Sequence, residues 1–379
     1  MSTKRIRNLA FTIHRYLGLA LGLLITLIGI TGSLLVFEQE IDSWLVNQQI
    51  ETITPQAEIV SSDRTFKTVQ AAYPDWKIDS FSWNGNEKQP LKVNAIAPNS
   101  QDEVGVYLHG IHTIFVNPYT GKILSDRAER FSYYRFLLNL HYRLFIPGDT
   151  GMYATGIAGL LLFVMAITGI ILWPGWRNFQ AGFKIKWNAH IKRRNFDLHK
   201  VTGIIAATFL GIIAITGFLI CFYNWSVPIT HAVTFSPQPN NEEETLVVNV
   251  NPQSDSSRAK LDILLQQAIK ALPDLQVGEI YVPASSTDPV EVYSKSYAQT
   301  IYLDPYTAKV LKIQGSSQEK SLGDRLVNSW IPLHFGTFGG LSTRILYVFV
   351  GLSPTILFTT ALIMYRLRRR PEFNFKGDP

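Results

Sequence analysis

Four long apolar stretches constrain this chain more than any other feature of its sequence. A helix that crosses the hydrocarbon core of a bilayer needs roughly 20 consecutive, mostly apolar residues. Stretches of that kind run from Leu17 to Phe37, Tyr153 to Trp173, Val201 to Tyr223 and Ile345 to Tyr365. The sequence therefore predicts a membrane protein that crosses the bilayer four times. The first is too long for the apolar region of a cleaved signal peptide, so we interpret it as a retained anchor.

The charges at the ends of these stretches predict the orientation. Lys and Arg concentrate in the cytoplasmic flanks of membrane helices. Here they concentrate before the first stretch, between the second and third, and after the fourth, whereas acidic side chains outnumber basic ones in the two long connecting segments. We therefore expect a bacterial inner-membrane protein with both termini in the cytoplasm and both long segments in the periplasm. The net charge of +6 then reflects topology, and we expect no nucleic-acid partner.

The chain also repeats itself. His14-Arg-Tyr-Leu-Gly18 and His199-Lys-Val-Thr-Gly203 precede Thr31-Gly32 and Thr216-Gly217, each by seventeen residues from the histidine. Leu140-His141 and Leu333-His334 precede the second and fourth stretches, which carry Thr168 and Thr360. Two passes separate the copies, so both copies have the same orientation. This predicts parallel repeats about a pseudo-two-fold axis along the membrane normal.

The two long segments repeat as well. Residues 113–124 and 300–311 both read as strand, Asn/Asp-Pro turn and strand. Helical periodicity precedes them at Phe66–Tyr73 and Ser256–Leu272. We expect two small periplasmic α+β domains. The predicted order is the N-terminal segment with the first membrane helix (1–37), domain one with an interfacial segment (38–150), helix two (151–174), a basic cytoplasmic loop (175–198), helix three (199–223), domain two with an interfacial segment (224–343), helix four (344–366) and a basic cytoplasmic tail (367–379).

Four of the eight histidines occupy the repeated positions. The topology places His14 and His199 near the cytoplasmic face, and His141 and His334 near the periplasmic face. Each pair takes one member from each repeat, so two imidazoles would face each other across the axis. Such a pair could hold one planar cofactor, which predicts two b-type haems with these histidines as axial iron ligands. One pair with a single haem is the nearest variant.

Small residues follow the repeated histidines at helical spacing. The first stripe contains Gly18, Gly22, Ile25, Gly29 and Gly32, and the second contains Gly203, Ala207, Gly211 and Ala214. Such stripes allow a flat macrocycle, or simply another helix, to approach the backbone closely. Both interpretations stay open for the stripe by itself.

Other metal and catalytic sites fit the sequence less well. A structural zinc site needs four Cys, His or carboxylate ligands in one place, which two pairs at opposite faces do not supply, and the single Cys221 excludes a Cys-ligated cluster. We expect His109 and His112 to face solvent, or at most to make an incidental metal contact, and His190 and His231 to lie on the surface. Nucleotide-binding, metalloprotease and nucleophile-elbow motifs are absent from the sequence. The cytoplasmic loop is too short for a nicotinamide or flavin domain, so an electron-transfer role needs an outside donor.

The duplicated His-x-x-x-Gly, Thr-Gly and Leu-His motifs, together with the Asn117-Pro-Tyr-Thr-Gly-Lys and Asp304-Pro-Tyr-Thr-Ala-Lys turns, resemble the PepSY-associated transmembrane family over nearly the whole chain. Members of this family include iron-regulated inner-membrane proteins and ferric-siderophore reductases. The resemblance implies iron uptake by a haem-dependent oxidoreductase. It would take electrons from a cytoplasmic or membrane donor and deliver them to a ferric siderophore, or another ferric chelate, in the periplasm. No catalytic residue is assigned.

Two alternatives remain. PepSY domains resemble parts of protease propeptides, so the long segments could bind or inhibit a periplasmic peptidase while the helices anchor them. An anchor has no need of duplicated histidines. A metal or siderophore permease should carry buried charges or broken helices near the midplane, and apart from Pro354 the four stretches do not.

Overall fold

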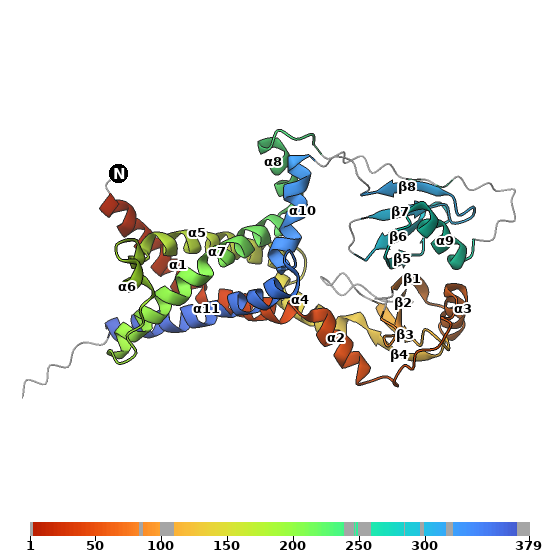
Figure 1. The fold of residues 1–379 in the computed structure, drawn as a ribbon, viewed down its shortest axis with the longest axis horizontal. Coiled ribbons are helices and arrows are strands. Elements are labelled where there is room, and N and C mark those ends of the chain that lie inside the picture. The colour runs from red at the N-terminus through yellow and green to blue at the C-terminus, as the bar shows by residue number, and fades with distance from the viewer. Residues whose placement is uncertain are drawn as a thin grey trace, which may run out of the picture. The chain divides into compact units, whose positions relative to one another are not determined.

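The computed structural model describes residues 3–82, 86–98, 110–238, 246, 248, 259–283, 285–295, 299–315 and 321–369 (Figure 1). The chain forms two compact units. The helical unit consists of Met1–Glu38, Leu137–Gln238 and Ser321–Pro379, and the sheet unit consists of Gln39–Phe136 and Pro239–Lys320. Each unit is therefore assembled from segments that are far apart in the sequence.

Among the described residues, four helices are long and apolar enough to cross a membrane, and all four belong to the helical unit. They are α1 (Thr3–Leu35), α5 (Thr150–Leu172), α7 (Ile191–Cys221) and α11 (Gly340–Arg369). This confirms the prediction of a multi-pass membrane protein. Helices α1 and α7 begin well before their apolar stretches, because the polar turns that precede these stretches continue the same helix.

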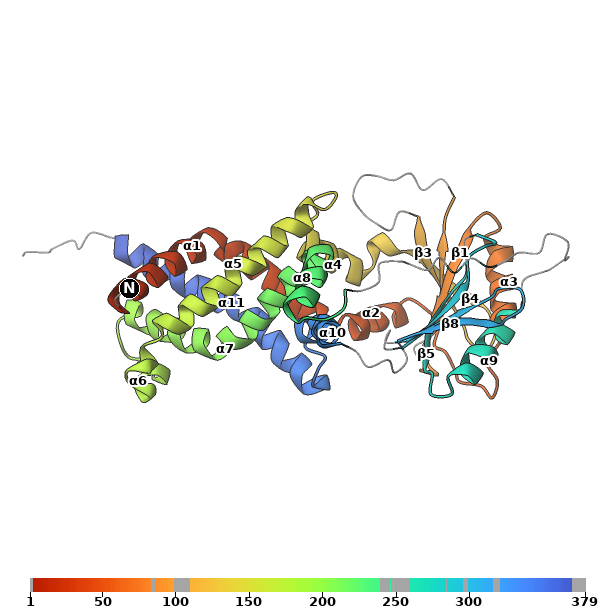
Figure 2. The ribbon, with the colours of Figure 1, turned by 90° about the horizontal axis from the view of Figure 1, so that it is seen from above.

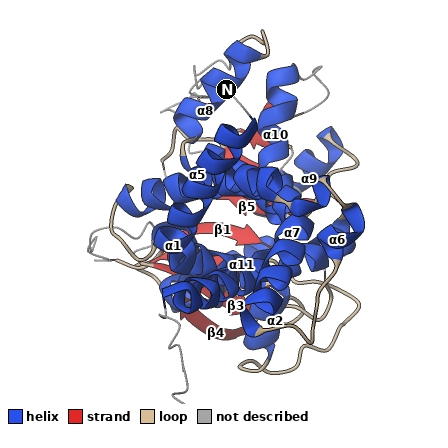
Figure 3. Cartoon of the chain, turned by 90° about the vertical axis from the view of Figure 1, so that its left-hand side faces the viewer, coloured by secondary structure: helices blue, strands red, loops and turns tan. Residues whose placement is uncertain are grey.

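The four helices form a bundle, seen end on in Figure 3. Helix α5 packs against α1 and α7, and α11 packs against the same two helices, so α1 and α7 lie on one diagonal. Helix α11 continues through Pro354. Proline has no N–H to offer the carbonyl of Val350, and the hydroxyl of Ser353 donates to that carbonyl instead, at 2.7 Å. The fourth stretch is thus an unbroken helix.

Shorter helices adjoin the membrane helices in the sequence. Helices α2 (Glu38–Asn47) and α8 (Tyr223–Val233) follow α1 and α7, while α4 (Tyr133–Arg143) and α10 (Leu322–Phe335) precede α5 and α11. Two hydroxyl–carbonyl bonds fix the last pair. Thr155 of α5 donates to the carbonyl of Tyr142, and Tyr347 of α11 donates to that of Leu333, both at 2.7 Å. The loop between α5 and α7 contains η2 (Pro174–Trp176) and α6 (Phe179–Phe183).

The sheet unit is one antiparallel sheet with the strand order β4-β3-β2-β1-β5-β6-β7-β8. The first lobe contains α3 (Ser62–Ala72), β1 (Lys77–Ser82), β2 (Leu91–Ile96), β3 (Ile111–Val116), β4 (Ile123–Ala128) and η1 (Glu129–Phe131). The second lobe contains α9 (Leu261–Ala271), β5 (Val277–Tyr281), β6 (Val290–Ser294), β7 (Thr300–Leu303) and β8 (Val310–Gln314). The expected strand–turn–strand segments are β3–β4 and β7–β8.

The two segments predicted to form α+β domains contribute their strands to one sheet. Strands β1 and β5 pair through Ser80↔Tyr281, Phe81↔Ile280 and Ser82↔Glu279. An exposed strand edge leaves N–H and C=O groups unpaired. Each lobe therefore covers the open edge of the other, and the two lobes share one sheet.

One face of this sheet carries the hydrophobic core, with α3 and α9 packed against it (Figure 2). Val93 and Ile114 of the first lobe, and Val292 and Ile301 of the second, are fully buried in one continuous cluster. They alternate along each strand with residues of the other face, as the two-residue period of a strand requires.

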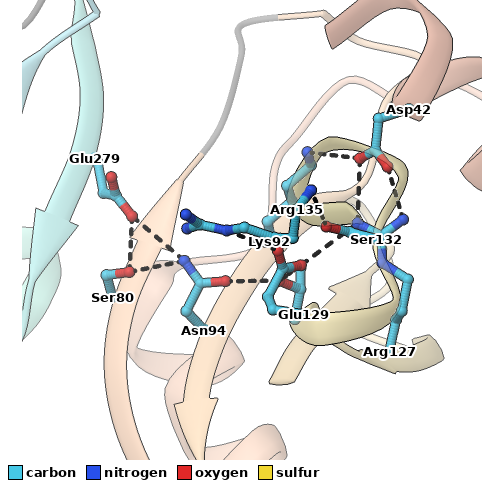
Figure 4. Close-up of polar contacts among 10 residues, drawn as sticks. Asp42, Ser80, Lys92, Asn94, Arg127, Glu129, Ser132, Arg135 and Glu279 are labelled. Carbon is cyan, nitrogen blue, oxygen red and sulfur yellow. Dashed lines mark hydrogen bonds and ion pairs between the residues drawn. The ribbon is translucent and has the colours of Figure 1, made fainter. Parts of the chain in front are cut away.

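The opposite face of the first lobe carries a chain of buried polar contacts (Figure 4). Glu279 accepts hydrogen bonds from Ser80 (2.7 Å) and Asn94 (3.4 Å). Thr113 donates to Asn94 (2.8 Å) and to Glu129 (2.7 Å). This series of polar contacts ends at Asp42 of α2. Its carboxylate accepts two hydrogen bonds from Arg127, at 2.8 and 3.2 Å, and lies 3.9 Å from the ammonium group of Lys92.

Candidate histidine site

The structure places the four repeated histidines in two pairs. His14 of α1 and His199 of α7 have ring centroids 6.2 Å apart, with an interplanar angle of 88°. His141 of α4 and His334 of α10 have centroids 6.3 Å apart, at 60°. All four rings are half-buried. Each pair takes one histidine from either side of the basic loop at residues 175–198.

Every one of these histidines has the same two partners on a neighbouring membrane helix. The Nδ1 atom lies within hydrogen-bond distance of a main-chain carbonyl and of the hydroxyl of the threonine three residues later. The partners are Met165 and Thr168 for His14 (both 3.1 Å), Ile28 and Thr31 for His141 (2.9 and 3.1 Å), Leu357 and Thr360 for His199 (both 3.0 Å), and Ile213 and Thr216 for His334 (2.9 and 3.2 Å).

These contacts assign the tautomer. A carbonyl oxygen can only accept, so Nδ1 must carry the proton, and Nε2 of a neutral imidazole then has a free lone pair. Burial lowers the pKa of His141, and burial together with the neighbouring His141 lowers the pKa of His334 to about 4. Both rings are therefore neutral at pH 7, which is the form that binds a metal.

Glycines that follow three of the threonines lie against the histidine rings. A carbon atom added to Gly32 would lie 2.9 Å from Cε1 of His141, and one added to Gly217 would lie 2.8 Å from Cε1 of His334. The corresponding distance from Gly169 to His14 is 3.2 Å. The fourth threonine, Thr360, is followed by alanine. The Thr-Gly motif thus provides the space that the imidazole occupies.

The rest of the small-residue stripe serves helix packing. Gly22 faces the ring of Phe358, and Gly29 faces the backbone of Gly351, both on α11. Gly211 lies near Phe163 and Ala166 of α5, with added-carbon distances of 3.7 and 3.8 Å. Of the two interpretations left open by the sequence, helix packing accounts for these positions.

Two basic residues beside the His14/His199 pair differ in their availability. Lys200 is buried, and its ammonium group contacts Asp197 at 2.7 Å and donates to the carbonyl of Ala181 at 2.8 Å. Arg15 donates to the hydroxyl of Tyr16 at 2.8 Å. Its Nε atom is buried and has no hydrogen-bond partner among the described residues. Arg15 therefore has a buried donor to offer an anionic group, and Lys200 does not.

The other histidines are separate from the pairs. His112 is half-buried, contacts Asp126 at 3.3 Å and lies 4.6 Å from the ring of Trp76, so it does not simply face solvent. His190 is exposed and caps α7. The expectation that His231 lies on the surface is wrong, because this side chain is 2% exposed and sits between Pro237 and Asp324. The packing of α8 beside α10 buries it. His109 lies outside the described residues.

The pairs can hold a metal that brings further ligands of its own. Metal–imidazole bonds are about 2.0–2.1 Å long and a ring nitrogen lies roughly 1 Å from its ring centre, so two rings on opposite sides of one ion have centroids roughly 6 Å apart. Both observed separations fit this value. Within the described residues, no group of three or more His, Cys, Asp or Glu side chains could hold an ion. An ion held by either pair would therefore need further ligands beyond the two imidazoles.

The family model of the PepSY-associated TM region matches residues 11–368. The chain belongs to the PepSY-associated TM family. The match includes all four paired histidines and the apolar part of all four membrane helices, and it confirms the family resemblance that the duplicated motifs indicated. No curated protein matches this member of the family.

Proposed function

We propose that this PepSY-associated TM protein is a transmembrane electron conduit with two b-type haems, one bound by His14 and His199 and the other by His141 and His334. The observation that carries the proposal is the fourfold anchoring of Nδ1, which leaves every Nε2 free to bind a metal. His14 and His141 are anchored within the first two membrane helices, and His199 and His334 within the last two. This supports parallel repeats about a pseudo-two-fold axis, because each repeat would orient one imidazole for each site.

The chain's own residues would bind and orient the cofactor. Haem iron supplies one-electron chemistry when bound. The threonines and carbonyls fix the axial imidazoles, the glycines that follow the threonines leave room for the rings, and Nε of Arg15 is available to a propionate carboxylate. Because haem brings nitrogen ligands of its own, the two histidines of each site would be enough to hold its iron.

The spacing of the two sites supports a function across the membrane. Along α1, His14 is separated from the anchor of His141, Ile28 to Thr31, by 14 to 17 residues. At the rise of an α-helix this is roughly 21–26 Å, which compares with a hydrocarbon core of roughly 30 Å. The two sites thus suit opposite leaflets.

We further propose the direction and the acceptor. Basic residues at the His14/His199 end favour a cytoplasmic location for this end, so a cytoplasmic or membrane-pool donor would supply electrons there. The sheet unit would then be periplasmic, as a pair of PepSY-like lobes. A ferric siderophore, or another ferric chelate, would accept one electron on that side. Reduction releases the metal, because Fe(II) binds hard oxygen ligands less tightly than Fe(III).

The test is a reduced-minus-oxidised spectrum and a pyridine haemochrome assay of the full-length protein in detergent. We expect a low-spin b-type spectrum and two haems per chain. His14→Ala and His141→Ala should each remove one haem, while His112→Ala and His190→Ala, outside the pairs, should remove none. One haem per chain that depends on a single pair would restrict the proposal to that pair. A colourless protein from haem-sufficient cells would overturn it and favour a peptidase-binding scaffold.

A further inference from the structure

The four threonines that contact the paired histidines share one arrangement. Each hydroxyl donates to carbonyls of its own helix, as in Thr168, which lies 2.9 Å from the oxygen of Val164 and 3.0 Å from that of Met165. Thr31, Thr216 and Thr360 make the same contacts three and four residues back. A hydroxyl has one proton but two lone pairs. With the proton given to the helix, the oxygen is an acceptor for the Nδ1–H beside it.

We propose that Thr31, Thr168, Thr216 and Thr360 are positioning residues, whose hydroxyls help to orient the four imidazoles and set the reduction potential of the iron. This inference rests on the proposed haem function and assigns a role to residues that bind no metal themselves. The carbonyl three residues earlier also accepts from Nδ1–H, so the hydroxyl is the second of two acceptors for one proton. It therefore adjusts the strength of the interaction while the carbonyl secures the tautomer.

The side chain of threonine suits this role. Its branched Cβ restricts χ1, and the bond back to the helix selects one of the two rotamers that remain. The position of the hydroxyl is thus determined by its own helix and does not depend on the imidazole. Each threonine also lies in the same half of the chain as the histidine that it contacts, so each ring is oriented by its own half.

The expected consequence is electronic. Hydrogen bonding from Nδ1–H to an acceptor makes the imidazole a more basic ligand, which stabilises Fe(III) more than Fe(II). Removing the hydroxyl should therefore raise the reduction potential. Partners outside the ligand set typically change metal affinity by 10–100-fold. Because the carbonyl remains, we expect the lower end of this range. A tenfold change in the preference for Fe(III) over Fe(II) corresponds to about 59 mV for a one-electron couple.

The experiment compares Thr→Val with Thr→Ser at each position in the full-length, haem-loaded protein. Valine keeps the volume but loses the hydroxyl, whereas serine keeps the hydroxyl. Thr26→Val is the matched control, since Thr26 lies in α1 and donates to the carbonyl of Gly22 at 2.7 Å. Potentiometric titration of the visible spectrum resolves the two haems. Valine at Thr168 or Thr360 should raise the potential of the His14/His199 haem alone, and valine at Thr31 or Thr216 that of the other haem alone.

The outcomes separate the inference from the function on which it rests. A site-specific rise with valine, restored by serine and absent in Thr26→Val, supports the inference. Valine variants that keep both haems at wild-type potentials overturn it, as does an equal loss of haem in the valine and serine variants, while the conduit itself stands. A wild-type protein without haem overturns the proposed function.

Discussion

The two units of this protein use matched segments of the chain in different ways. In the helical unit, each of the four paired histidines contacts the same two kinds of group, a main-chain carbonyl oxygen and a threonine hydroxyl, at 2.9 to 3.2 Å. In the sheet unit, the two lobes keep a common core face, where Val93 corresponds to Val292 and Ile114 to Ile301. Their opposite faces differ. The two halves of the helical unit thus make the same polar contacts at their histidines, whereas the two lobes of the sheet unit match in their apolar core face and differ on the opposite face.

The pairing of the strands identifies corresponding positions on the opposite faces of the two lobes, and these positions carry different side chains. Lys92 and Asn94 of β2 occupy the places of Glu291 and Tyr293 in β6. Asn94 belongs to the buried polar chain of the first lobe, whereas Tyr293 packs against Tyr281 with centroids 5.4 Å apart and donates to Glu291 at 2.6 Å. Many sets of side chains can satisfy the polar groups of a sheet face. A histidine that must present one particular nitrogen has far fewer solutions.

The largest predicted effect tests the space beside the rings. Gly217→Ala places a carbon 2.8 Å from Cε1 of His334, and the ring cannot withdraw because its Nδ1 is held. We expect haem retention at this pair to fall at least tenfold, in line with the loss of a partner around a metal. Gly169→Ala, at 3.2 Å from His14, should cost less. The haemochrome ratio checks both.

Gly211→Ala is the control for this series, because its added carbon would lie 3.7 Å from Phe163 and touches no histidine. We expect wild-type haem content. Equal losses at Gly217 and Gly211 would show that the bundle as a whole, rather than the ring contact, determines haem binding.

The next prediction concerns the buried ion pair of the first lobe. Arg127→Met leaves Asp42, which is 6% exposed, with Lys92 at 3.9 Å as its remaining cation. Removing one partner of a buried pair costs about 3 kcal/mol. The corresponding position of the second lobe is Gln314, an exposed residue whose carbonyl accepts from Tyr302, and Gln314→Met should cost less than about 1 kcal/mol. Hydrogen exchange of β3–β4 and β7–β8 in the full-length protein measures both, and equal costs would contradict the contrast.

A smaller effect is expected where the lobes join. Ser80→Ala removes the 2.7 Å hydrogen bond to Glu279, a carboxylate that is 7% exposed and keeps Asn94 at 3.4 Å. Leaving a buried acceptor partly unsatisfied costs about 1–2 kcal/mol. Amides of β1 and β5 should then exchange faster, with β7–β8 as the internal reference. Unchanged protection of β1 and β5 would mean that the hydrogen bond from Ser80 to Glu279 does not stabilise the junction between the lobes.

The sequence predicts local features of this protein far better than contacts between distant segments. The four apolar stretches are sufficient to find the membrane helices, and Asn117 and Asp304 mark the two turns, where each side-chain oxygen accepts from backbone N–H groups two and three residues on. The β1–β5 pairing could not be found in this way, because neither strand carries a signal that names its partner. The burial of His231 by α8 and α10 depends on tertiary packing in the same way.

The threonines lie between these two cases. Thr31 follows His14 by seventeen residues, and this spacing places them at opposite ends of one helix. The repeat therefore identifies both residues but does not predict their partners, since Thr31 contacts His141 and His14 contacts Thr168. A signal was present: every Leu-His motif has a Thr-Gly partner in the preceding membrane helix. Only the fold shows that the two are in contact.

The smallest predicted effect involves a contact that both lobes share. Asp262 accepts from the backbone N–H of Ser62 at 2.8 Å, and Asp63 accepts from that of Leu261 at 3.1 Å, so each carboxylate caps the helix of the other lobe. Burial and the hydrogen bond to Asp262 raise the pKa of Asp63. Burial acts against the charge of Asp262 too, but hydrogen bonds from Asp63 and Ser62 outweigh it and lower the pKa of Asp262. One shared proton on Asp63 therefore favours the pair.

The sign of the pH dependence follows from these directions. A raised pKa stabilises the fold below the unfolded value, about 3.9 for Asp, and this contribution is lost as the pH rises through the folded value. A lowered pKa stabilises it above the unfolded value, and that contribution is lost as the pH falls through the folded one. The shared cap should thus be strongest near pH 4 and weaker at pH 7, where the two carboxylates repel each other.

Asp63→Asn tests this account, because its amide N–H replaces the shared proton at every pH. We expect the variant to match the wild type near pH 4 and to be more stable than it at pH 7, whereas Asp63→Ala, which loses the cap, should be about 1 kcal/mol less stable. Hydrogen exchange of the first turns of α3 and α9 at the two pH values measures the difference. If Asn and Ala destabilise equally at pH 7, repulsion between the two carboxylates does not weaken the cap at that pH, and the proposed pH dependence is wrong.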